Sequence, residues 1–380
     1  MALILTEEQT ELVAMVRDFV RAEIVPQVAA CDTAGECPPG YFDSAFDMGL
    51  HMLEIPEEYG GGGLDFATTA MVFEELGWAD AGYAITLVST FVALRNVILA
   101  GTPEQAKTFA DLVAPGGLGA FVLSEPGAGS DAAAIRTTAV RDGDEYVLNG
   151  TKTWITNGGI AQVYAVLAKT DPDAGHRGIS CFIVETDRPG VSWGTHEDKC
   201  GLRTSNTCDV VLDQVRVPAD HLVGAEGQGF RIAMQGLDFS RAFMATICVG
   251  MMQRALDEAV AYARERQQFG QPIIEFQLVQ KLLADMAAQT EAARCLVHNT
   301  MRMMDAGLPV TREGAITKML VTDMLQDVAS KAIQVLGGNG YTKEYPVEKI
   351  FRDAKVFQIM EGTNEIQALV IGRSLARGHA

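Results

Sequence analysis

Residues 123–131 read LSEPGAGSD and residues 152–159 read KTWITNGG, and these two glycine-rich segments decide how the chain is interpreted. The first places glycine amides and hydroxyl groups in one turn after the apolar run 121–123, which is typical of a loop that binds a phosphate or a heteroaromatic ring. It is no nicotinamide site of the βαβ kind, because the third glycine and the acidic residue of that fingerprint are missing. Taken alone, it could also be an ordinary Ser/Gly turn.

The region around these segments, residues 120–227, is predicted to be a β domain. Short runs rich in β-branched and aromatic residues alternate there with Gly and Asp turns. The clearest runs are 146–148, 163–168, 179–184 and 210–217. Because no helix separates them, they predict an antiparallel barrel or sandwich rather than βαβ units.

Both flanking regions, 1–119 and 228–380, are predicted to be helical. The first begins with a capping box at Thr6–Gln9 and an amphipathic helix that Pro26 stops or kinks. The long helices of the second carry apolar residues near heptad spacing, which predicts a four-helix bundle. The helical segments are 42–49, 68–76, 84–100, 236–266, 277–304, 311–336 and 365–377. The expected fold class is therefore α+β with three domains: N-terminal helical, middle antiparallel β and C-terminal four-helix bundle.

The composition limits the class of partner. The 380-residue chain carries a net charge of −19, so a nucleic acid or an anionic membrane surface would be repelled. No apolar stretch approaches a membrane span and nothing resembles a signal peptide, which predicts a soluble, cytoplasmic protein. The 7 cysteines form no CxxC pair and fit reduced thiols, and the 6 histidines show no ligand spacing, so no metal site is expected. An anionic ligand would need a local basic anchor.

Five segments in register resemble the acyl-CoA dehydrogenase family. Besides LSEPGAGSD and KTWITNGG, they are RQQFG at 266–270 with FQ at 276–277, QVLGGNGY at 334–341 and EGTNEIQ at 361–367. They occur in the family's order and spacing over essentially the whole chain, and the succession of helical, β and helical regions agrees. One such motif is weak evidence, but five leave little room for coincidence.

The resemblance implies FAD as the cofactor. Trp154 would pack on the flavin, Thr156 would bond near the N5 atom that receives hydride, and Arg266 with its neighbours would hold the diphosphate and adenosine. Gln334 and Gly338 would reach the same cofactor from a neighbouring subunit. The full set of expected FAD contacts is Leu123, Ser124, Gly129, Ser130, Trp154, Thr156, Arg266, Phe269, Gln277, Gln334, Gly338, Thr363 and Glu365.

These residues also have plainer interpretations. Trp154 could be a strand aromatic in the core, Arg266 could pair with Glu265, and Gly337–Gly338 could simply end a helix. The combination of motifs, rather than any one residue, favours the flavin interpretation.

Glu361 is expected to be the catalytic base. It follows the apolar run 356–360, where a carboxylate would be poorly solvated and its pKa raised. The family's usual glutamate lies in this E-G-T/S segment. Some members place the base beside an L-D-x-x-R motif instead, here LDFSR at 237–241, but that position holds Ser240. The plainer interpretation of Glu361 is a helix-capping acid near Thr363.

The resemblance also implies the reaction. Glu361 would remove the α-proton of an acyl-CoA thioester while the β-hydrogen leaves as hydride to the flavin, which yields a 2-enoyl-CoA in fatty acid or amino acid catabolism. Substrate contacts are expected from Ser130, Asp238, Arg241 and Gly362, with Arg241 as the basic anchor. The family further implies a homotetramer built as a dimer of dimers, and an electron-transfer flavoprotein as electron acceptor.

The acyl group and the outcome of the reaction stay more open. Glutaryl-CoA dehydrogenases carry an arginine after a Gly-Tyr pair, whereas Ala84 follows Gly82–Tyr83 here, so a short or medium chain without a terminal carboxylate is expected. Arg95 lies about three turns further along the same helix, and Met360 replaces a common aromatic residue. An acyl-CoA oxidase, a 2-enoyl-CoA reductase, a decarboxylating dehydrogenase and a non-catalytic acyl-CoA or flavin-binding scaffold are the alternatives.

Overall fold

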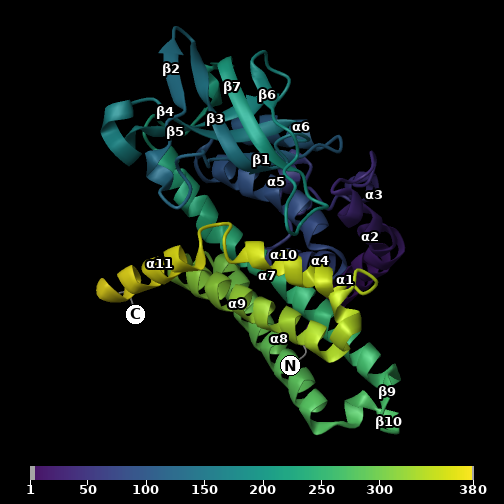
Figure 1. Cartoon of the computed structure of the whole chain (residues 1–380). Helices are drawn as coiled ribbons and strands as arrows, with labels where there is room; N and C mark the ends of the chain where they lie inside the picture. Colours follow the sequence, from purple (N-terminus) through teal and green to yellow (C-terminus); the bar gives the residue numbers. More distant parts are fainter. Residues whose placement is uncertain (1–4, 379–380) are drawn as a thin grey trace.

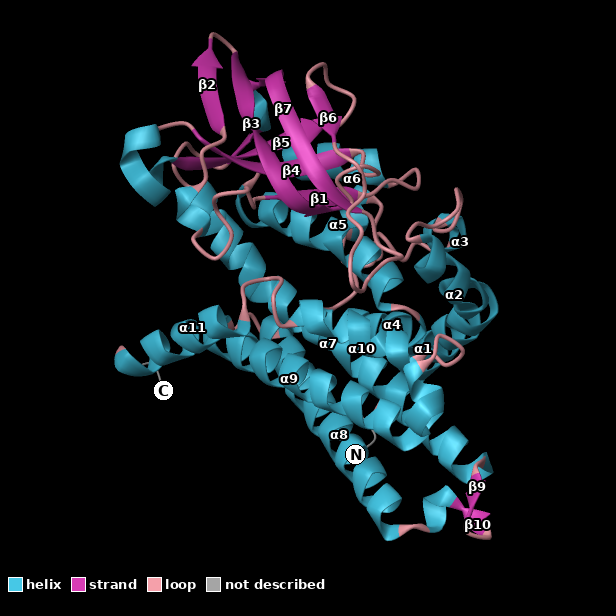
Figure 2. Cartoon of the chain, viewed as in Figure 1, coloured by secondary structure: helices cyan, strands magenta, loops and turns pink. Residues whose placement is uncertain are grey.

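The structure is a computed structural model that describes residues 5–378 of the chain. An N-terminal group of helices, a β sheet and a group of long C-terminal helices follow one another (Figure 1). The sheet lies at one end of the molecule, and the long helices extend away from it (Figure 2). The three-part fold class expected from the sequence is confirmed.

The N-terminal helices follow the signals in the sequence. They are α1 (Glu7–Phe19), α2 (Val25–Ala34), α3 (Asp43–Asp47), α4 (Phe66–Ala79), α5 (Ala81–Ala100) and α6 (Pro103–Val113). Thr6 and Gln9 form the predicted capping box of α1. At Pro26 the chain kinks rather than stops, because a π-helical turn (Val20–Ile24) leads directly into α2. A proline in the first turn of a helix removes no intrahelical bond.

Two N-terminal helices differ from the expectations. α6 was not predicted, although its Thr102–Gln105 capping box and its Pro103 at the first helical position are standard start signals. α5 is long and apolar enough to cross a membrane, contrary to the expectation that no stretch is. Most of α5 is buried inside the protein, where it packs on the long helices and the sheet, so it is a core helix of this fold.

The middle region forms one mixed sheet rather than a purely antiparallel one. Its strands are β1 (Gly119–Val122), β2 (Thr138–Asp142), β3 (Glu145–Thr156), β4 (Val163–Lys169), β5 (Ile179–Glu185), β6 (Val191–Trp193), β7 (Thr207–Pro218) and β8 (Leu222–Val223). The order is β6-β7-β3-β2-β4-β5-β8, and β1 pairs with β4. β1 and β4 are parallel, as is the single pairing of β2 with β4, because the chain makes its β2–β3 hairpin before it returns beside β1.

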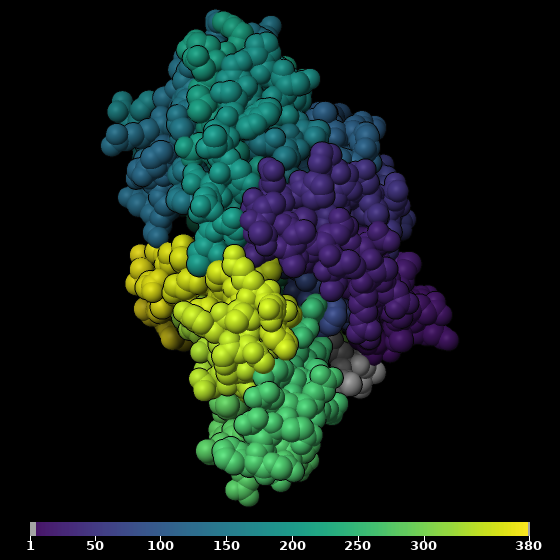
Figure 3. Space-filling model, turned by 45° about the vertical axis from the view of Figure 1, so that its right-hand side comes forward, coloured from purple at the N-terminus to yellow at the C-terminus, as the bar shows by residue number. Residues whose placement is uncertain are grey.

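The C-terminal region contains α7 (Gly229–Glu265), α8 (Gln277–Asp305), α9 (Thr311–Leu336), α10 (Val347–Phe357) and α11 (Asn364–Ala376). The predicted bundle counted α11 as its fourth helix and missed α10. In the structure α10 packs against both α7 and α9, whereas α11 packs chiefly on α9. α10 also links the C-terminal helices to the N-terminal ones, because Arg352 on α10 forms an ion pair with Asp32 of α2 at 2.7 Å. The N-terminal and C-terminal segments meet on one face below the sheet (Figure 3).

A buried ion pair joins the two glycine-rich segments. Lys152 on β3 is fully buried, and its Nζ donates to Glu125 Oε1 at 2.9 Å and to the Leu123 carbonyl at 3.0 Å. The Glu125 carboxylate also accepts from the Arg136 N–H and from the N–H and hydroxyl of Thr137. Burial lowers the pKa of Lys152 to about 8, although Glu125 opposes this. The pair fixes both loops at one place on the sheet.

Replacement of Lys152 by methionine should therefore loosen both loops. Lys152→Met leaves the Glu125 carboxylate buried without its counter-charge, which costs about 3 kcal/mol or more of unfolding free energy. Denaturant unfolding should show this loss, and the double variant Lys152→Met/Glu125→Gln should recover part of it. An unchanged free energy of unfolding in the single variant would contradict the ion pair's role.

Candidate active site

The two glycine-rich segments meet where the chain leaves β1 beside β3. The Thr153 N–H donates to the Ser124 carbonyl at 2.9 Å. Trp154 beside it has a left-handed backbone (φ 60°) and a side chain that is 62% exposed, so the interpretation as a core aromatic is wrong. Thr156 is half-buried two residues further along β3. Of the predicted flavin-facing residues, Trp154 is exposed, Ser124 and Thr156 are half-buried, and Leu123 is buried beneath them.

The same region has free hydrogen-bond donors. Among residues 5–378, the backbone N–H groups of Gly127, Gly129 and Ser130 make no hydrogen bond, and all three residues are exposed. Successive free amides form a site for anions or for the polar edge of a ring, and the exposed Trp154 ring offers a stacking face. The residues present therefore fit FAD: residues 154–156 would hold its flavin, and the amides of 127–130 would bind its polar groups.

Glu361 lies in a strained turn between α10 and α11. Its backbone is left-handed (φ 57°), which for a residue other than glycine costs on the order of 1 kcal/mol. Gly362 is also left-handed (φ 86°), and a Cβ there would lie only 2.6 Å from Gln367 Nε2, so the position needs glycine. Thr363 then starts α11, because its hydroxyl accepts from the Ile366 N–H. The helix cap is thus Thr363, not Glu361.

The carboxylate of Glu361 contacts the other position at which the family can carry its base. Ser240 on α7 donates from Oγ to Glu361 Oε2 at 2.6 Å, although 121 residues separate the two in sequence. Burial raises the pKa of Glu361, while the Ser240 hydroxyl and the charges of Arg241 and Lys318 partly offset that rise. The result is a shielded carboxylate that is a stronger base than an exposed one.

Asp238 and Arg241 lie beside this carboxylate on α7. Their ion pair (Nη1 to Oδ1) is 2.5 Å long, and Thr311 donates to the second oxygen of Asp238. Arg241 is buried, and its Nε has no hydrogen-bond partner among the described residues. Asp238 thus holds the Arg241 guanidinium in place beside the Glu361 turn.

Two residues that were not predicted hold the Glu361 turn. Lys318 on α9 is fully buried and donates from Nζ to the Gly362 carbonyl at 2.9 Å and to Asn364 Oδ1 at 2.8 Å. Burial lowers the pKa of Lys318 to about 8, against the attraction of Glu361. Gln367 on α11 donates to the carbonyls of both Glu361 and Gly362. The sequence signal for Gln367 was its place at the end of the EGTNEIQ motif, whereas Lys318 had only its place in an apolar helical stretch.

A second group of predicted cofactor residues lies at the far end of the long helices. Tyr262, near the end of α7, accepts a hydrogen bond from Asn339 in the turn after α9, so that turn and the α7–α8 connection lie together. At about 1.5 Å per residue, the 26 residues of α7 from Ser240 to Arg266 span roughly 39 Å. The residues gathered at this end are Arg266, Phe269, Gln277, Gln334 and Gly338, all exposed.

This arrangement changes one expectation. Arg266, Phe269 and Gln277 were predicted to hold the diphosphate of the same chain's cofactor, with only Gln334 and Gly338 reaching across from a neighbour. The structure places all five together at the far end of α7, roughly 39 Å along that helix from Ser240. The Arg266 side chain forms no ion pair with Glu265 among the described residues. Glu365 is exposed on the first turn of α11.

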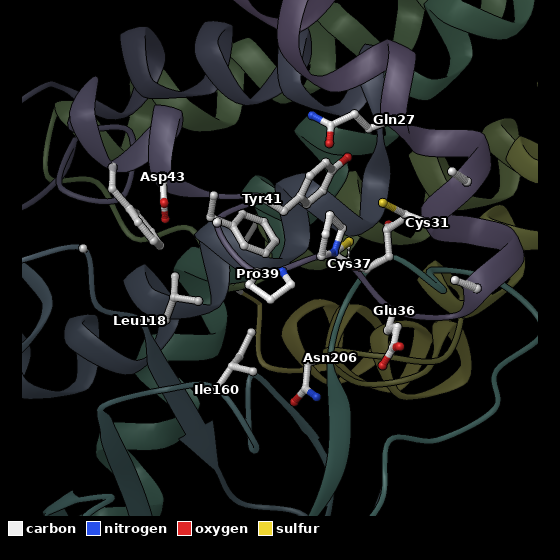
Figure 4. Close-up of a pocket in the computed structure, with 18 of the residues that line it drawn as sticks. Gln27, Cys31, Glu36, Cys37, Pro39, Tyr41, Asp43, Leu118, Ile160 and Asn206 are labelled. Carbon is white, nitrogen blue, oxygen red and sulfur yellow. Dashed lines mark hydrogen bonds between the residues drawn. The ribbon is translucent and has the colours of Figure 1, made fainter.

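A large cavity has none of these residues on its walls. It measures about 1010 Å³ and opens between the segment after α2 and the sheet, with Cys37, Tyr41, Ile160 and Asn206 on its walls (Figure 4). It contains none of the predicted site residues. All 7 cysteines are free thiols, and residues 5–378 hold no group of three or more metal-ligating side chains.

Comparison with known proteins decides the family. Models of the acyl-CoA dehydrogenase N-terminal, middle and C-terminal domains match residues 6–116, 120–215 and 227–376. The chain belongs to the acyl-CoA dehydrogenase family. It is an FAD-dependent enzyme that dehydrogenates acyl-CoA thioesters, as the motifs implied.

Relatives cover nearly the whole chain. An acyl-CoA dehydrogenase of Bacillus subtilis is 42% identical over 375 residues, which cover 98% of this chain and 99% of the relative. The structure of butyryl-CoA dehydrogenase from Megasphaera elsdenii superposes with a TM-score of 0.96 at 40% identity, covering 99% of this chain and 100% of that one. A chain from a study of the electron transferring flavoprotein of Acidaminococcus fermentans also superposes with a TM-score of 0.96 at 40% identity, covering 99% of this chain and 100% of that one.

Substitution of Glu361 tests the assignment of the base. Glu361→Gln keeps the shape of the turn but cannot accept a proton, so kcat with butyryl-CoA and an artificial electron acceptor should fall at least about a hundredfold. The FAD content should stay the same. The surface variant Glu104→Gln serves as the control.

The pH profile of the wild-type enzyme is a second test of Glu361 as the base. The base works deprotonated and its pKa is raised, so kcat/KM should fall with decreasing pH at a higher pH than an exposed glutamate would produce. Near-normal kcat in Glu361→Gln would show that another group takes the proton.

Proposed function

We propose that Glu361 removes the α-proton from a short- or medium-chain acyl-CoA without a terminal carboxylate, and that the electrons pass to an electron-transfer flavoprotein. The observation that carries the proposal is the half-buried Glu361, whose carboxylate lies against Ser240 in a left-handed turn. Ser240 and Glu361 are the two positions at which the family resemblance expects a base, and only one of them holds an acid.

The chemistry follows from what the turn presents. An α-proton of a thioester is weakly acidic, so negative charge that develops on the thioester oxygen must be stabilised. The Glu361 N–H makes no hydrogen bond within residues 5–378 and is available as such a donor. With the oxygen held there, the α-carbon would lie near the carboxylate that belongs to the same residue. FAD, when bound, supplies the acceptor for the β-hydride.

Other residues assist this step. Ser240 donates to one oxygen of the Glu361 carboxylate, which leaves the second oxygen for the proton. Arg241, fixed by Asp238, adds positive charge beside the Glu361 carboxylate and serves as the basic anchor for the substrate. Its local charge offsets the acidic character of the chain toward an anionic CoA ester.

The surroundings of α5 support an acyl chain without a second charge. Ala84 is fully buried and offers no donor. Arg95 is engaged, because it pairs with Glu54 and its guanidinium lies 4.7 Å from the Phe66 ring centroid and 5.1 Å from that of Phe239. A distal carboxylate would therefore be buried without a partner, which is strongly unfavourable.

Substrate comparison tests this selectivity. The ratio kcat/KM for glutaryl-CoA should be at least about a hundredfold below that for butyryl-CoA, since an unpaired buried carboxylate costs several kcal/mol. Isobutyryl-, 2-methylbutyryl- and hexanoyl-CoA complete the series and find the preferred chain. If glutaryl-CoA is the best substrate, Arg95 must exchange Glu54 for the substrate, and Arg95→Met should then abolish that preference.

The electron acceptor and the location are proposed on separate grounds. A structure very similar to this chain comes from work on an electron transferring flavoprotein, which supports a partner of that class over molecular oxygen. Peroxide release during turnover would instead favour the oxidase alternative. All 7 cysteines are free thiols, which supports a location in the reducing cytoplasm.

A homotetramer built as a dimer of dimers would bring the two groups of cofactor residues together. The flavin-facing segment 154–156 lies on the sheet, whereas the residues at 266–277 lie at the far end of α7, roughly 39 Å along that helix from Ser240. The far end also exposes large apolar side chains: Phe269 is 94% exposed, Leu278 83% and Tyr341 85%. Such a patch on a soluble protein marks a contact surface, here the cofactor and interface of a second copy.

Measurement of mass in solution tests this assembly. Light scattering at low protein concentration should give about four times the chain mass of 40.8 kDa. Phe269→Asp should lower both the mass and the FAD content, because it places a charge in the apolar contact. A stable, FAD-loaded and fully active monomer would contradict the shared site.

A further inference from the structure

Gln367 is a member of the EGTNEIQ motif to which no role has been assigned. It lies on the first turn of α11 and is fully buried. Its Nε2 donates to the Glu361 carbonyl at 3.2 Å and to the Gly362 carbonyl at 2.9 Å. One amide group thus engages two successive carbonyls of the turn that carries the base.

The turn is held from a second side as well. The Gly362 carbonyl also accepts from Lys318 Nζ at 2.9 Å, so both carbonyls of the turn point into the protein. The N–H groups of residues 361, 362 and 363 form no hydrogen bond within the described chain. The turn therefore presents amide donors on its open side and keeps its acceptors on the closed side.

These contacts fix the dihedral angles on which the base depends. The direction of the Glu361 carbonyl is set by the ψ angle of Glu361. The direction of the Gly362 carbonyl is set by the backbone angles of Gly362. Glu361 is left-handed, a conformation that a residue with a Cβ leaves unless its surroundings hold it. If the Glu361 backbone relaxed, its carboxylate and its N–H would move together, away from Ser240 and from the substrate.

We propose that Gln367 is a positioning residue for the dehydrogenation: it holds the Glu361–Gly362 turn so that carboxylate and amide reach the substrate at the same time. This inference rests on Glu361 being the base. It assigns no contact between Gln367 and the substrate. Gln367 acts through the backbone of Glu361, and Lys318 supports the same turn from α9.

A purely structural role makes a different prediction. If Gln367 only satisfies buried carbonyls, its replacement should reduce the amount of folded, FAD-loaded enzyme. The kcat per bound FAD should then stay the same. A positioning residue slows the proton-transfer step in every molecule. The kinetic isotope effect separates the two, because it does not depend on how much enzyme is active.

The variant Gln367→Met keeps the side-chain length and removes both donors. Turnover of butyryl-CoA is compared with that of its α,α-dideuterated form, per mole of bound FAD, beside Gln105→Met as the matched control. Gln105 is also buried, and its Nε2 also donates to two carbonyls, those of Asp220 and Leu222, between α6 and β8. If Gln367→Met binds no FAD, Gln367→Asn replaces it, since asparagine keeps the donors on a shorter arm.

The expected result is a fall in kcat of about tenfold or more per FAD, because small misplacements of a catalytic group carry large rate penalties. KM should change little, and the α-deuterium effect should increase as proton removal becomes slower. Gln105→Met should show normal kcat per FAD and an unchanged isotope effect. An unchanged isotope effect and kcat per FAD in the Gln367 variant overturn the proposal. Glu361→Gln is assayed in parallel, and full activity there would overturn the base assignment instead.

Discussion

The site depends on one strained residue, the left-handed Glu361 between α10 and α11. Its backbone conformation costs free energy, and its carboxylate is raised in pKa by burial. The turn keeps this conformation because Ser240 donates a hydrogen bond to the Glu361 carboxylate, and Lys318 and Gln367 donate to the Gly362 carbonyl. The same strain that destabilises the turn places an acid and a free amide side by side, which proton removal next to a carbonyl requires.

The fold brings these groups together from distant parts of the chain. α7 supplies Ser240 and Arg241, α9 supplies Lys318, and the α10–α11 turn supplies Glu361, the proposed base. α10 is tied in turn to the N-terminal part by a buried cluster in which Lys349 bonds Asp80 at 2.5 Å and Asp353 at 2.6 Å. Helix packing over long sequence distances therefore sets the geometry of the site.

Much of this could be predicted from the sequence, because glycine-rich turns, strand runs and long amphipathic helices have strong local signals. The motif around Glu361 and the Ser240 position were found in that way, and the structure places the two in contact. Local patterns could not reveal Lys318, since a buried lysine on a helix looks like a solvated one until its partners are known. The parallel pairing of β1 with β4 was missed for a related reason: it depends on a return of the chain after an intervening hairpin.

The length of α7 could be predicted from the sequence, but which predicted cofactor residues meet at its far end could not. Periodicity indicates a long helix; only the three-dimensional arrangement puts Arg266 and Gln334 at the same remote end. The motifs of one sequence thus lie at two distant places in the molecule, which supports the proposed assembly of several copies of the chain.

The most direct measurement is a crystal structure of the Glu361→Gln variant with FAD and butyryl-CoA bound. The thioester oxygen should lie about 3 Å from the N–H of residue 361, and the α-carbon should lie within about 3.5 Å of its side chain. The Gln367 amide should still bond both carbonyls of the turn. An acyl group bound instead in the cavity beside Cys37 and Tyr41, with the side chain of residue 361 out of reach, would contradict the assignment of Glu361 as the base.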